Sequence, residues 1–84
     1  MASQDDEQDL RRMARAAMCS GLLPNNRPER VWGGKGTGAT CAVCARSIDA
    51  IELEFELDFE PPVRMHARCF AVWDEERSGG RYRA

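Results

Sequence analysis

The 84-residue sequence predicts a single small α+β domain with an N-terminal helix, a β-hairpin and a C-terminal helix. Three observations lead to this fold class. Apolar residues recur at helical spacing near both ends, a central segment alternates strictly between apolar and acidic residues, and two close pairs of cysteine and histidine flank that segment. We expect the domain to span residues 9–77, between a disordered acidic N-terminus (1–8) and a flexible tail (78–84).

The first predicted helix runs from Asp9 to about Gly21. Acidic residues precede it, as a helix N-terminus favours, and Gly21 and Pro24 provide a stop. Its apolar residues share one face, because they follow one another at steps of one, three and four residues. They are Leu10, Met13, Ala14, Ala17, Met18 and Gly21. We interpret this face as packing on the domain core, with docking on a partner as the alternative.

A proline-containing connector and a glycine-rich segment, residues 33–38, follow the helix. A phosphate-binding loop would need Lys and Ser or Thr directly after its last glycine and then a helix, but a cysteine pair follows here. A dinucleotide-binding motif also fails, because no helix follows at the required distance. We therefore expect the glycines to allow tight turns beside the cysteines, with Trp32 packed against the core.

The segment from Ile48 to Phe59 is the clearest predicted strand, since five apolar residues alternate with acidic ones. One face should be buried and the acidic face solvated, which is a simpler interpretation than catalytic carboxylates or a calcium site. Pro61 and Pro62 permit a reversal into a short return strand, 63–65, that delivers His66. A third strand is expected either near residues 31–32 or around 41–44.

Residues 67–77 form the second predicted helix, which Ser78, Gly79 and Gly80 terminate. Residues at steps of three and four lie on one face of a helix. This face carries His66, Cys69, Phe70, Trp73 and Arg77. The helix should therefore direct two candidate ligands and two aromatic rings toward the same interior.

The candidate ligands Cys41, Cys44, His66 and Cys69 read C-x2-C-x21-H-x2-C, a layout typical of a structural zinc site. We expect one Zn²⁺ ion. Two disulfides are the alternative for four cysteines, but no secretory signal precedes them, which favours the reducing cytoplasm and metal binding. Iron, in a rubredoxin-like site or a cluster, is the competing metal. Cys19 lies outside the motif and is expected to be a small buried helix residue or a free thiol.

Four protein donors close the zinc shell, so the predicted site is structural and the protein is not an enzyme. A Cys–His nucleophile is the rival interpretation, but it would need an exposed low-pKa thiol beside His66 and an orienting third group. The leading hypothesis is a zinc-stabilised module that binds a protein partner. Oxidation of Cys69 or its neighbours, with release of zinc, would instead make the domain a redox or metal sensor.

Charge is segregated along the chain, whose formal net charge is -2. A globally basic nucleic-acid-binding protein is therefore excluded, but a local basic face between residues 10 and 46 supports nucleic-acid binding as the second hypothesis. Its candidate residues are Arg11, Arg12, Arg15, Arg27, Arg30, Lys35 and Arg46. The chain has no apolar run of membrane-spanning length, so no membrane partner is expected. The sequence does not determine the oligomeric state.

The ligand spacing, Ile48 and the run from His66 to Phe70 resemble the first zinc module of LIM domains. The order of cysteine pair, hairpin and helix resembles the treble-clef zinc fingers more broadly. Residues 31–77 are also similar to small uncharacterised zinc-finger-like proteins of proteobacteria. The resemblance implies a treble-clef-like fold with zinc at the four candidate ligands. A second LIM module is not expected, because Val72 and Trp73 stand where its cysteines would begin.

Overall fold

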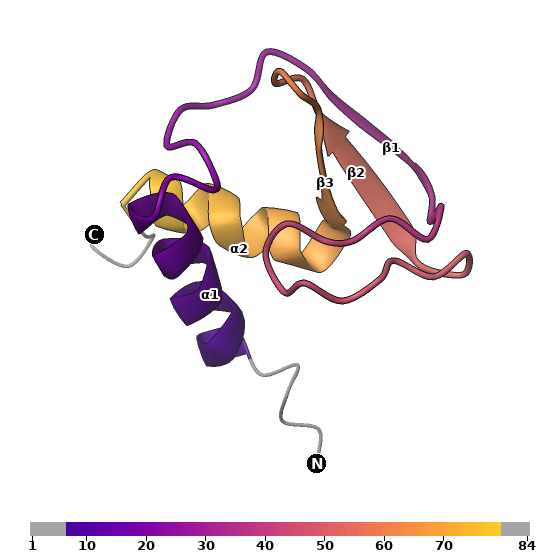
Figure 1. Ribbon diagram of the computed structural model, residues 1–84, viewed down its shortest axis with the longest axis horizontal. Coiled ribbons are helices and arrows are strands. Elements are labelled where there is room, and N and C mark those ends of the chain that lie inside the picture. The colour runs from indigo at the N-terminus through magenta and orange to yellow at the C-terminus, as the bar shows by residue number, and fades with distance from the viewer. Residues whose placement is uncertain (1–6, 80–84) are drawn as a thin grey trace.

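A computed structural model describes residues 7–79, which form two helices and a three-stranded antiparallel sheet (Figure 1). The predicted α+β class is confirmed. The elements in chain order are α1 (Glu7–Cys19), β1 (Val31–Lys35), β2 (Leu53–Leu57), β3 (Val63–His66) and α2 (Ala67–Arg77). The sheet order is β1-β2-β3. Most of the predicted disordered N-terminus (1–6) and most of the predicted tail (80–84) lie outside the described residues.

Helix α1 begins at Glu7, two residues before the predicted start. Leu10, Ala14 and Ala17 are buried, and the helix packs on α2, so the core-packing interpretation is confirmed. Met13 is the exception on the predicted apolar face, because more than a third of it is exposed. Neither helix of the described chain has the length and apolar character needed to cross a membrane.

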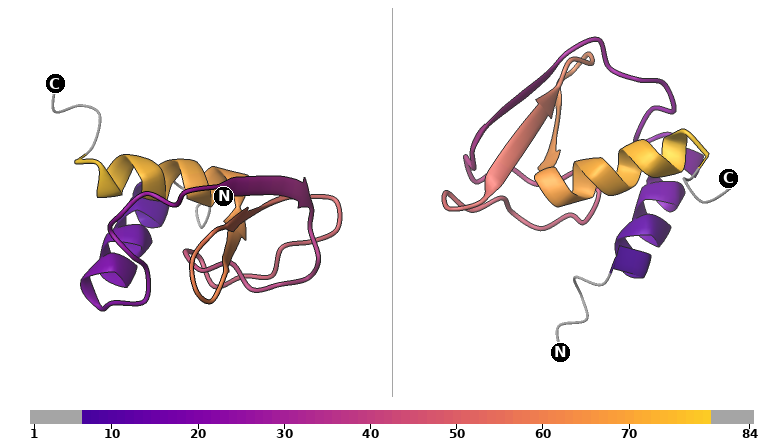
Figure 2. Two further views of the ribbon diagram at one scale, coloured as in Figure 1. Left: turned by 90° about the horizontal axis from the view of Figure 1, so that it is seen from above. Right: turned by 180° about the vertical axis from the view of Figure 1, so that it is seen from behind.

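Helix α2 links the other parts of the fold, because it contacts α1 as well as β2 and β3 (Figure 2). Its observed bounds match the predicted ones. Trp73 is fully buried, and its ring lies edge-on to Phe59 with 6.3 Å between centroids. Phe70 lies 5.1 Å from Phe55 by the same measure. The aromatic residues of α2 thus meet the apolar residues of the central strand, as the helical spacing predicted.

Strand β2 is shorter than predicted, and its first apolar residues are not buried. Ile51 is 94% exposed and lies before the strand, and Leu53 is 51% exposed, whereas Leu57 is fully buried. Helix α2 starts next to β3 and covers the sheet through Phe70 and Trp73. Leu53 instead borders a cavity at the start of α2, together with Ala67 and Arg68, which leaves about half of it exposed.

The third strand is β1, which agrees with the first of the two predicted locations. It pairs with β2 along its whole length, from Val31 opposite Leu57 to Lys35 opposite Leu53. The prediction that Trp32 packs on the core is wrong: Trp32 lies in β1 with 48% of its surface exposed. Trp32 points to the face of the sheet that carries Glu56, opposite the face covered by α2.

The first two glycines of the glycine-rich segment, Gly33 and Gly34, lie in β1, and the part after β1 lies against the loop that leads into β2. A Cβ atom on Gly36 would lie 1.9 Å from the backbone oxygen of Asp49, so only glycine fits there without a backbone shift. Gly36 also donates its N–H to the carbonyl of Glu52 at 2.9 Å. Gly38 has a φ of 85° and donates to Ile48. The expected tight turns are present.

The acidic face of β2 is not wholly solvated, which corrects the prediction for Glu54. This residue is only 4% exposed. Its carboxylate accepts hydrogen bonds from the Thr37 backbone N–H at 2.8 Å, the Thr37 hydroxyl at 2.9 Å and Arg64 at 3.0 Å. Burial opposes ionisation, but these three donors outweigh it and lower the pKa of Glu54 below its ordinary value.

Replacing Glu54 with glutamine is expected to reduce the acid sensitivity of the fold. A lowered folded-state pKa stabilises the protein above the ordinary pKa, and this contribution is lost as pH falls through the folded-state value. Hydrogen bonds to a charged group contribute about 1.5–3 kcal/mol, so the variant should be less stable by about this amount at pH 7 and equally stable near pH 2. Denaturant unfolding at several pH values measures this. Glu56→Gln is the control, and an equal effect in both variants would contradict the prediction.

Candidate metal centre

The first ligand pair lies in a tight turn of the backbone. The turn is closed by hydrogen bonds from the Cys41 N–H to Arg46 and from the Ala45 N–H to Cys41, each 2.9 Å long. Ala45 adopts a φ of 66°, in the left-handed region, which allows the chain to reverse within a few residues. The Val43 N–H points at the Cys41 sulfur at 3.4 Å. The turn therefore presents both sulfurs on one side and donates a backbone hydrogen bond to one of them.

The second ligand pair lies where β3 passes into α2. His66 is the last residue of β3 and has extended backbone angles, and Cys69 lies in the first turn of α2. The hairpin holds His66 through its pairing with Glu54 of β2. The Ala42 N–H donates to the carbonyl of Arg64 at 2.9 Å and so joins the cysteine turn to β3. These two features bring the ligand pairs together.

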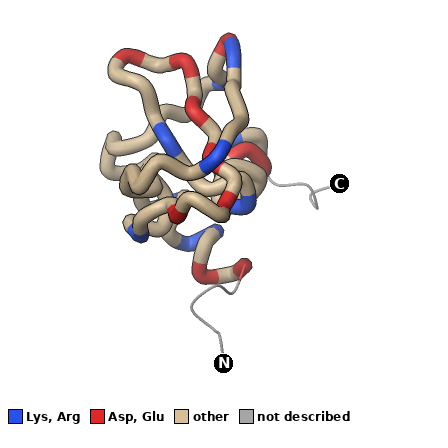
Figure 3. Tube along the Cα trace, turned by 90° about the vertical axis from the view of Figure 1, so that its right-hand side faces the viewer, with Lys and Arg blue, Asp and Glu red and all other residues tan. Residues whose placement is uncertain are grey.

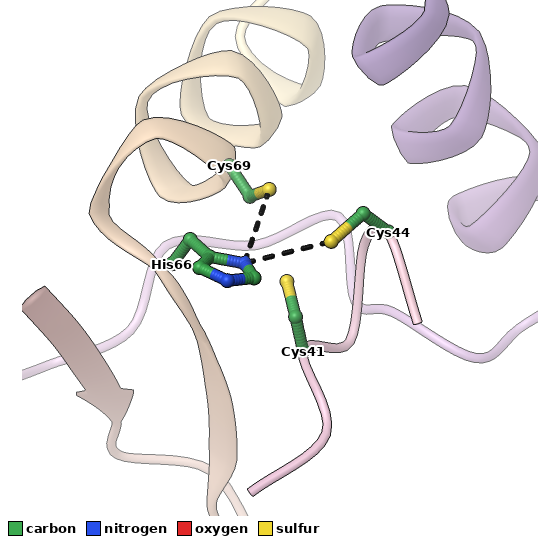
Figure 4. A group of neighbouring side chains, drawn as sticks. All are labelled: Cys41, Cys44, His66 and Cys69. Carbon is green, nitrogen blue, oxygen red and sulfur yellow. Dashed lines mark hydrogen bonds between the residues drawn. The ribbon is translucent and has the colours of Figure 1, made fainter. Parts of the chain in front are cut away.

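The four predicted ligands form one cluster, with all donor atoms within 4.8 Å of one another (Figure 4). The His66 Nδ1 atom lies 3.5 Å from the Cys44 sulfur and 3.8 Å from the Cys69 sulfur. A tetrahedron with Zn–S bonds of about 2.3 Å and Zn–N bonds of about 2.0 Å has edges of about 3.5–3.8 Å. The donor set and its dimensions therefore fit a tetrahedral metal ion, and all the cysteines are free of disulfides.

Glu52 supports His66 from outside the ligand set. Its carboxylate lies 3.2 Å from His66 Nε2, the ring nitrogen that faces away from the sulfurs. The Asp49 N–H holds the same carboxylate at 2.8 Å, and this hydrogen bond is the main cause of the lowered pKa of Glu52. A carboxylate on the far nitrogen fixes the orientation of a ligating imidazole. Sequence reasoning missed this role, because Glu52 is one of five similar acidic residues in the strand segment.

The sulfurs share negative charge unequally. A hydrogen bond from Cys69, assisted by backbone N–H groups, lowers the pKa of Cys41 to about 4. The same Cys41–Cys69 contact, with burial, raises the pKa of Cys69, and burial raises that of Cys44. Burial lowers the pKa of His66, but its contacts with Cys41 and Glu52 outweigh this and raise it. Cys41 is thus the sulfur that carries negative charge most readily, and a divalent cation would favour the thiolate form of all three cysteines.

The cluster is closed on one side and accessible on the other. Cys41 and Cys69 are 1% and 3% exposed, whereas Cys44 and His66 are partly exposed. A cavity of about 250 Å³ adjoins Cys44, His66 and Cys69 and is otherwise lined by residues such as Arg46 and Arg68. Cys19 lies outside the cluster; of its two predicted states, the free thiol is confirmed and the buried helix residue is not, because Cys19 is exposed on α1.

The candidate nucleic-acid-binding residues do not form one surface. Arg11 and Arg15 bind Glu76 of α2 at 2.8 and 2.9 Å, and Arg12 pairs with Asp9. The remaining four, Arg27, Arg30, Lys35 and Arg46, are exposed on the connector, on β1 and beside the cysteine turn. Figure 3 shows basic and acidic positions interspersed on the side that it views. The structure therefore brings the candidate metal ligands together, but it engages three of the seven candidate arginine and lysine residues in ion pairs within the protein.

Replacing Glu52 with alanine is expected to weaken metal binding by about 10–100-fold, the usual effect of losing an outer-shell carboxylate. The reason is that His66 would lose the acceptor that fixes its ring. Competition with a chromophoric chelator measures the affinity. Glu56→Ala is the matched control, because Glu56 belongs to the same alternating acidic segment but lies within β2 and contacts Arg64 instead. Equal affinities for the two variants would show that Glu52 does not position the ligand.

Comparisons with models of known protein families, with curated proteins and with solved structures gave no match to this chain.

Proposed function

We propose that this chain is a non-enzymatic protein in which one zinc ion stabilises a small protein-interaction module of the treble-clef type. The observation that carries the proposal is the clustering of four donor atoms, from Cys41, Cys44, His66 and Cys69, within 4.8 Å. Three sulfurs and one imidazole nitrogen are the donors that zinc prefers in structural sites. Bound there, zinc would hold the cysteine turn to the start of α2.

The arrangement of elements supports the treble-clef assignment. A cysteine turn, a hairpin (β2 and β3) and a helix follow one another, and the second ligand pair lies at the junction of hairpin and helix. Each ligand pair comes from a different part of the chain, so the metal would cross-link segments that are far apart in the sequence. This is how zinc substitutes for a large core in a small domain.

A structural role is favoured over catalysis because the protein supplies all four donors of a tetrahedral shell. An activated water would need one of these positions. An interaction role is supported by large apolar residues on the surface, since Ile51 is 94%, Leu22 78% and Leu53 51% exposed. Nucleic-acid binding has less support, because Arg11 and Arg15 already bind carboxylates of α2.

Native mass spectrometry with and without a strong chelator tests the proposal. We expect one zinc ion per chain, lost together with the fold when the chelator is added. Cys44→Ser should abolish binding of the ion, and Cys19→Ser should not. Iron in place of zinc, or a fully folded chain without any metal, would contradict the proposal. Salt-sensitive binding to DNA or RNA in fluorescence anisotropy would favour the nucleic-acid alternative.

A further inference from the structure

The two edges of the sheet differ in how they are covered. At the β3 edge, the carbonyl of Arg64 accepts the N–H of Ala42, so the cysteine turn lies along this edge. The β1 edge lies on the outside of the molecule in Figure 1 and in the two views of Figure 2. All five residues of β1 are exposed. An exposed edge strand is a template for pairing with another strand.

The register shows which backbone groups of β1 point outward. The Asp58 N–H donates to the carbonyl of Arg30, and the Gly36 N–H donates to the carbonyl of Glu52, each across from its partner. Hydrogen-bonded pairs recur at every second residue of an antiparallel ladder. The residues between these positions that bond to β2 are therefore Trp32 and Gly34. The N–H and C=O groups of Val31, Gly33 and Lys35 point away from β2, and within residues 7–79 no hydrogen bond reaches them.

The side chains on one face of β1 leave a hollow beside a projecting ring. Trp32 and Gly34 are on the same face, and Trp32 is 48% exposed. A Cβ atom on Gly34 would meet nothing within 4 Å. A cavity of about 140 Å³ lies over this part of the sheet, between Trp32, Gly34, Thr37 and Glu56. The strand therefore offers a large side chain and, two residues away, a space for one.

We propose that two copies of this chain pair through β1 as antiparallel strands, centred on Gly33. In this register Val31 lies opposite the partner's Lys35, and Gly33 opposite the partner's Gly33. All outward backbone groups of the strand then form hydrogen-bonded pairs. Trp32 lies opposite the partner's Gly34 in a non-hydrogen-bonded pair, where Cα atoms are about 4.5 Å apart. Each indole ring fills the hollow that glycine leaves on the other copy.

Charge supports a second copy as the occupant. Lys35 is the one charged residue of β1, and in this register it faces an uncharged valine, so like charges are not opposed. Arg30 lies opposite the partner's uncharged Gly36, so like charges are not opposed at either end of the paired strands.

Concentration-dependent mass measurement by analytical ultracentrifugation tests the inference. The paired area is small, so we expect a weak dimer whose population rises between about 1 μM and about 1 mM. Gly34→Val should leave the monomer folded, because a Cβ fits there without contacts, but its branched side chain should displace the partner's Trp32 and abolish the dimer. Val31→Pro removes one outward N–H and should weaken the dimer as well. Ile51→Ser, which changes an exposed residue away from β1, should have no effect.

A single-chain mass for the unmodified protein at every concentration would overturn the inference, as would a dimer that survives Gly34→Val. Association that Ile51→Ser abolishes would place the contact elsewhere and also overturn it. The proposed dimer rests on the proposed function as an interaction module, and it identifies a second copy of this chain as the partner. The metal content and circular dichroism of the same samples separate the two: a folded, zinc-loaded monomer contradicts only the dimer, whereas a folded dimer without metal contradicts only the zinc.

Discussion

Replacing Cys69 with alanine, or adding a strong chelator, is expected to unfold residues 41–73. Structural zinc contributes about 10–16 kcal/mol to the folding of small zinc-finger peptides. The net stability of a whole domain is about 5–15 kcal/mol. Cys69 is a buried ligand at the start of α2, so its loss would release the helix from the cysteine turn as well as open the metal shell. Loss of amide dispersion in NMR spectra would report the unfolding.

Cys19→Ser is the matched control for this experiment, because Cys19 is an exposed cysteine outside the cluster. It should retain both the metal and the fold. Retention of the native spectrum by Cys69→Ala in the presence of chelator would show that the apolar core is sufficient without the metal. In that case the fold would depend mainly on the contacts of α2 with α1 and the sheet.

Replacing Trp73 with alanine is expected to destabilise the domain by about 3–5 kcal/mol, since it leaves a cavity in the centre of the core. Trp73 is fully buried and lies against Phe59 and Phe70. Its Nε1 also donates to the Pro24 carbonyl at 3.2 Å, which ties the connector to α2. Denaturant unfolding of the metal-loaded protein measures the loss of free energy.

Trp32→Ala is the control, because it removes the same side chain from the half-exposed surface of β1. A surface substitution of this kind should change the free energy of unfolding of the monomer by about 0.5 kcal/mol or less. Trp73→Phe should lie between the two, because it keeps an aromatic ring but loses the hydrogen bond to Pro24. If both alanine variants were equally stable, the core would not be centred on Trp73.

The elements and ligands that depend on local sequence were predicted well. Helix α2 has its predicted bounds because the periodic spacing of Cys69, Phe70 and Trp73 and the following glycines are local features. The return strand begins at Val63 as predicted, because Pro61 and Pro62 place the reversal, and it is one residue longer than the predicted 63–65 because it includes His66. The four candidate ligands meet because each short pair is confined to one turn or junction. Only the folding of the intervening hairpin is needed to join the two pairs.

Predictions about burial succeeded less often, because burial depends on segments distant in the sequence. The local sequence does not tell which of Trp32 and Trp73 is more buried. In the structure Trp32 is half exposed and Trp73 is fully buried. Glu54 has the same apolar neighbours as Glu56, but only Glu54 is covered by Thr37 and satisfied by Arg64. A carboxylate can be buried only where hydrogen-bond donors from other segments reach it. The alternating pattern of apolar and acidic residues does not show where those donors lie.

By itself, the sequence determined the fold class, the two helices, the hairpin and the four candidate metal ligands, since periodicity and ligand spacing act over short stretches of chain. The tertiary structure alone decided that β1 is an uncovered edge and that Glu52 supports His66. It also decided that Arg11 and Arg15 bind α2. The physical reason is that strand order, ion pairing and outer-shell hydrogen bonds depend on which distant segments pack together, and packing is determined by the whole chain.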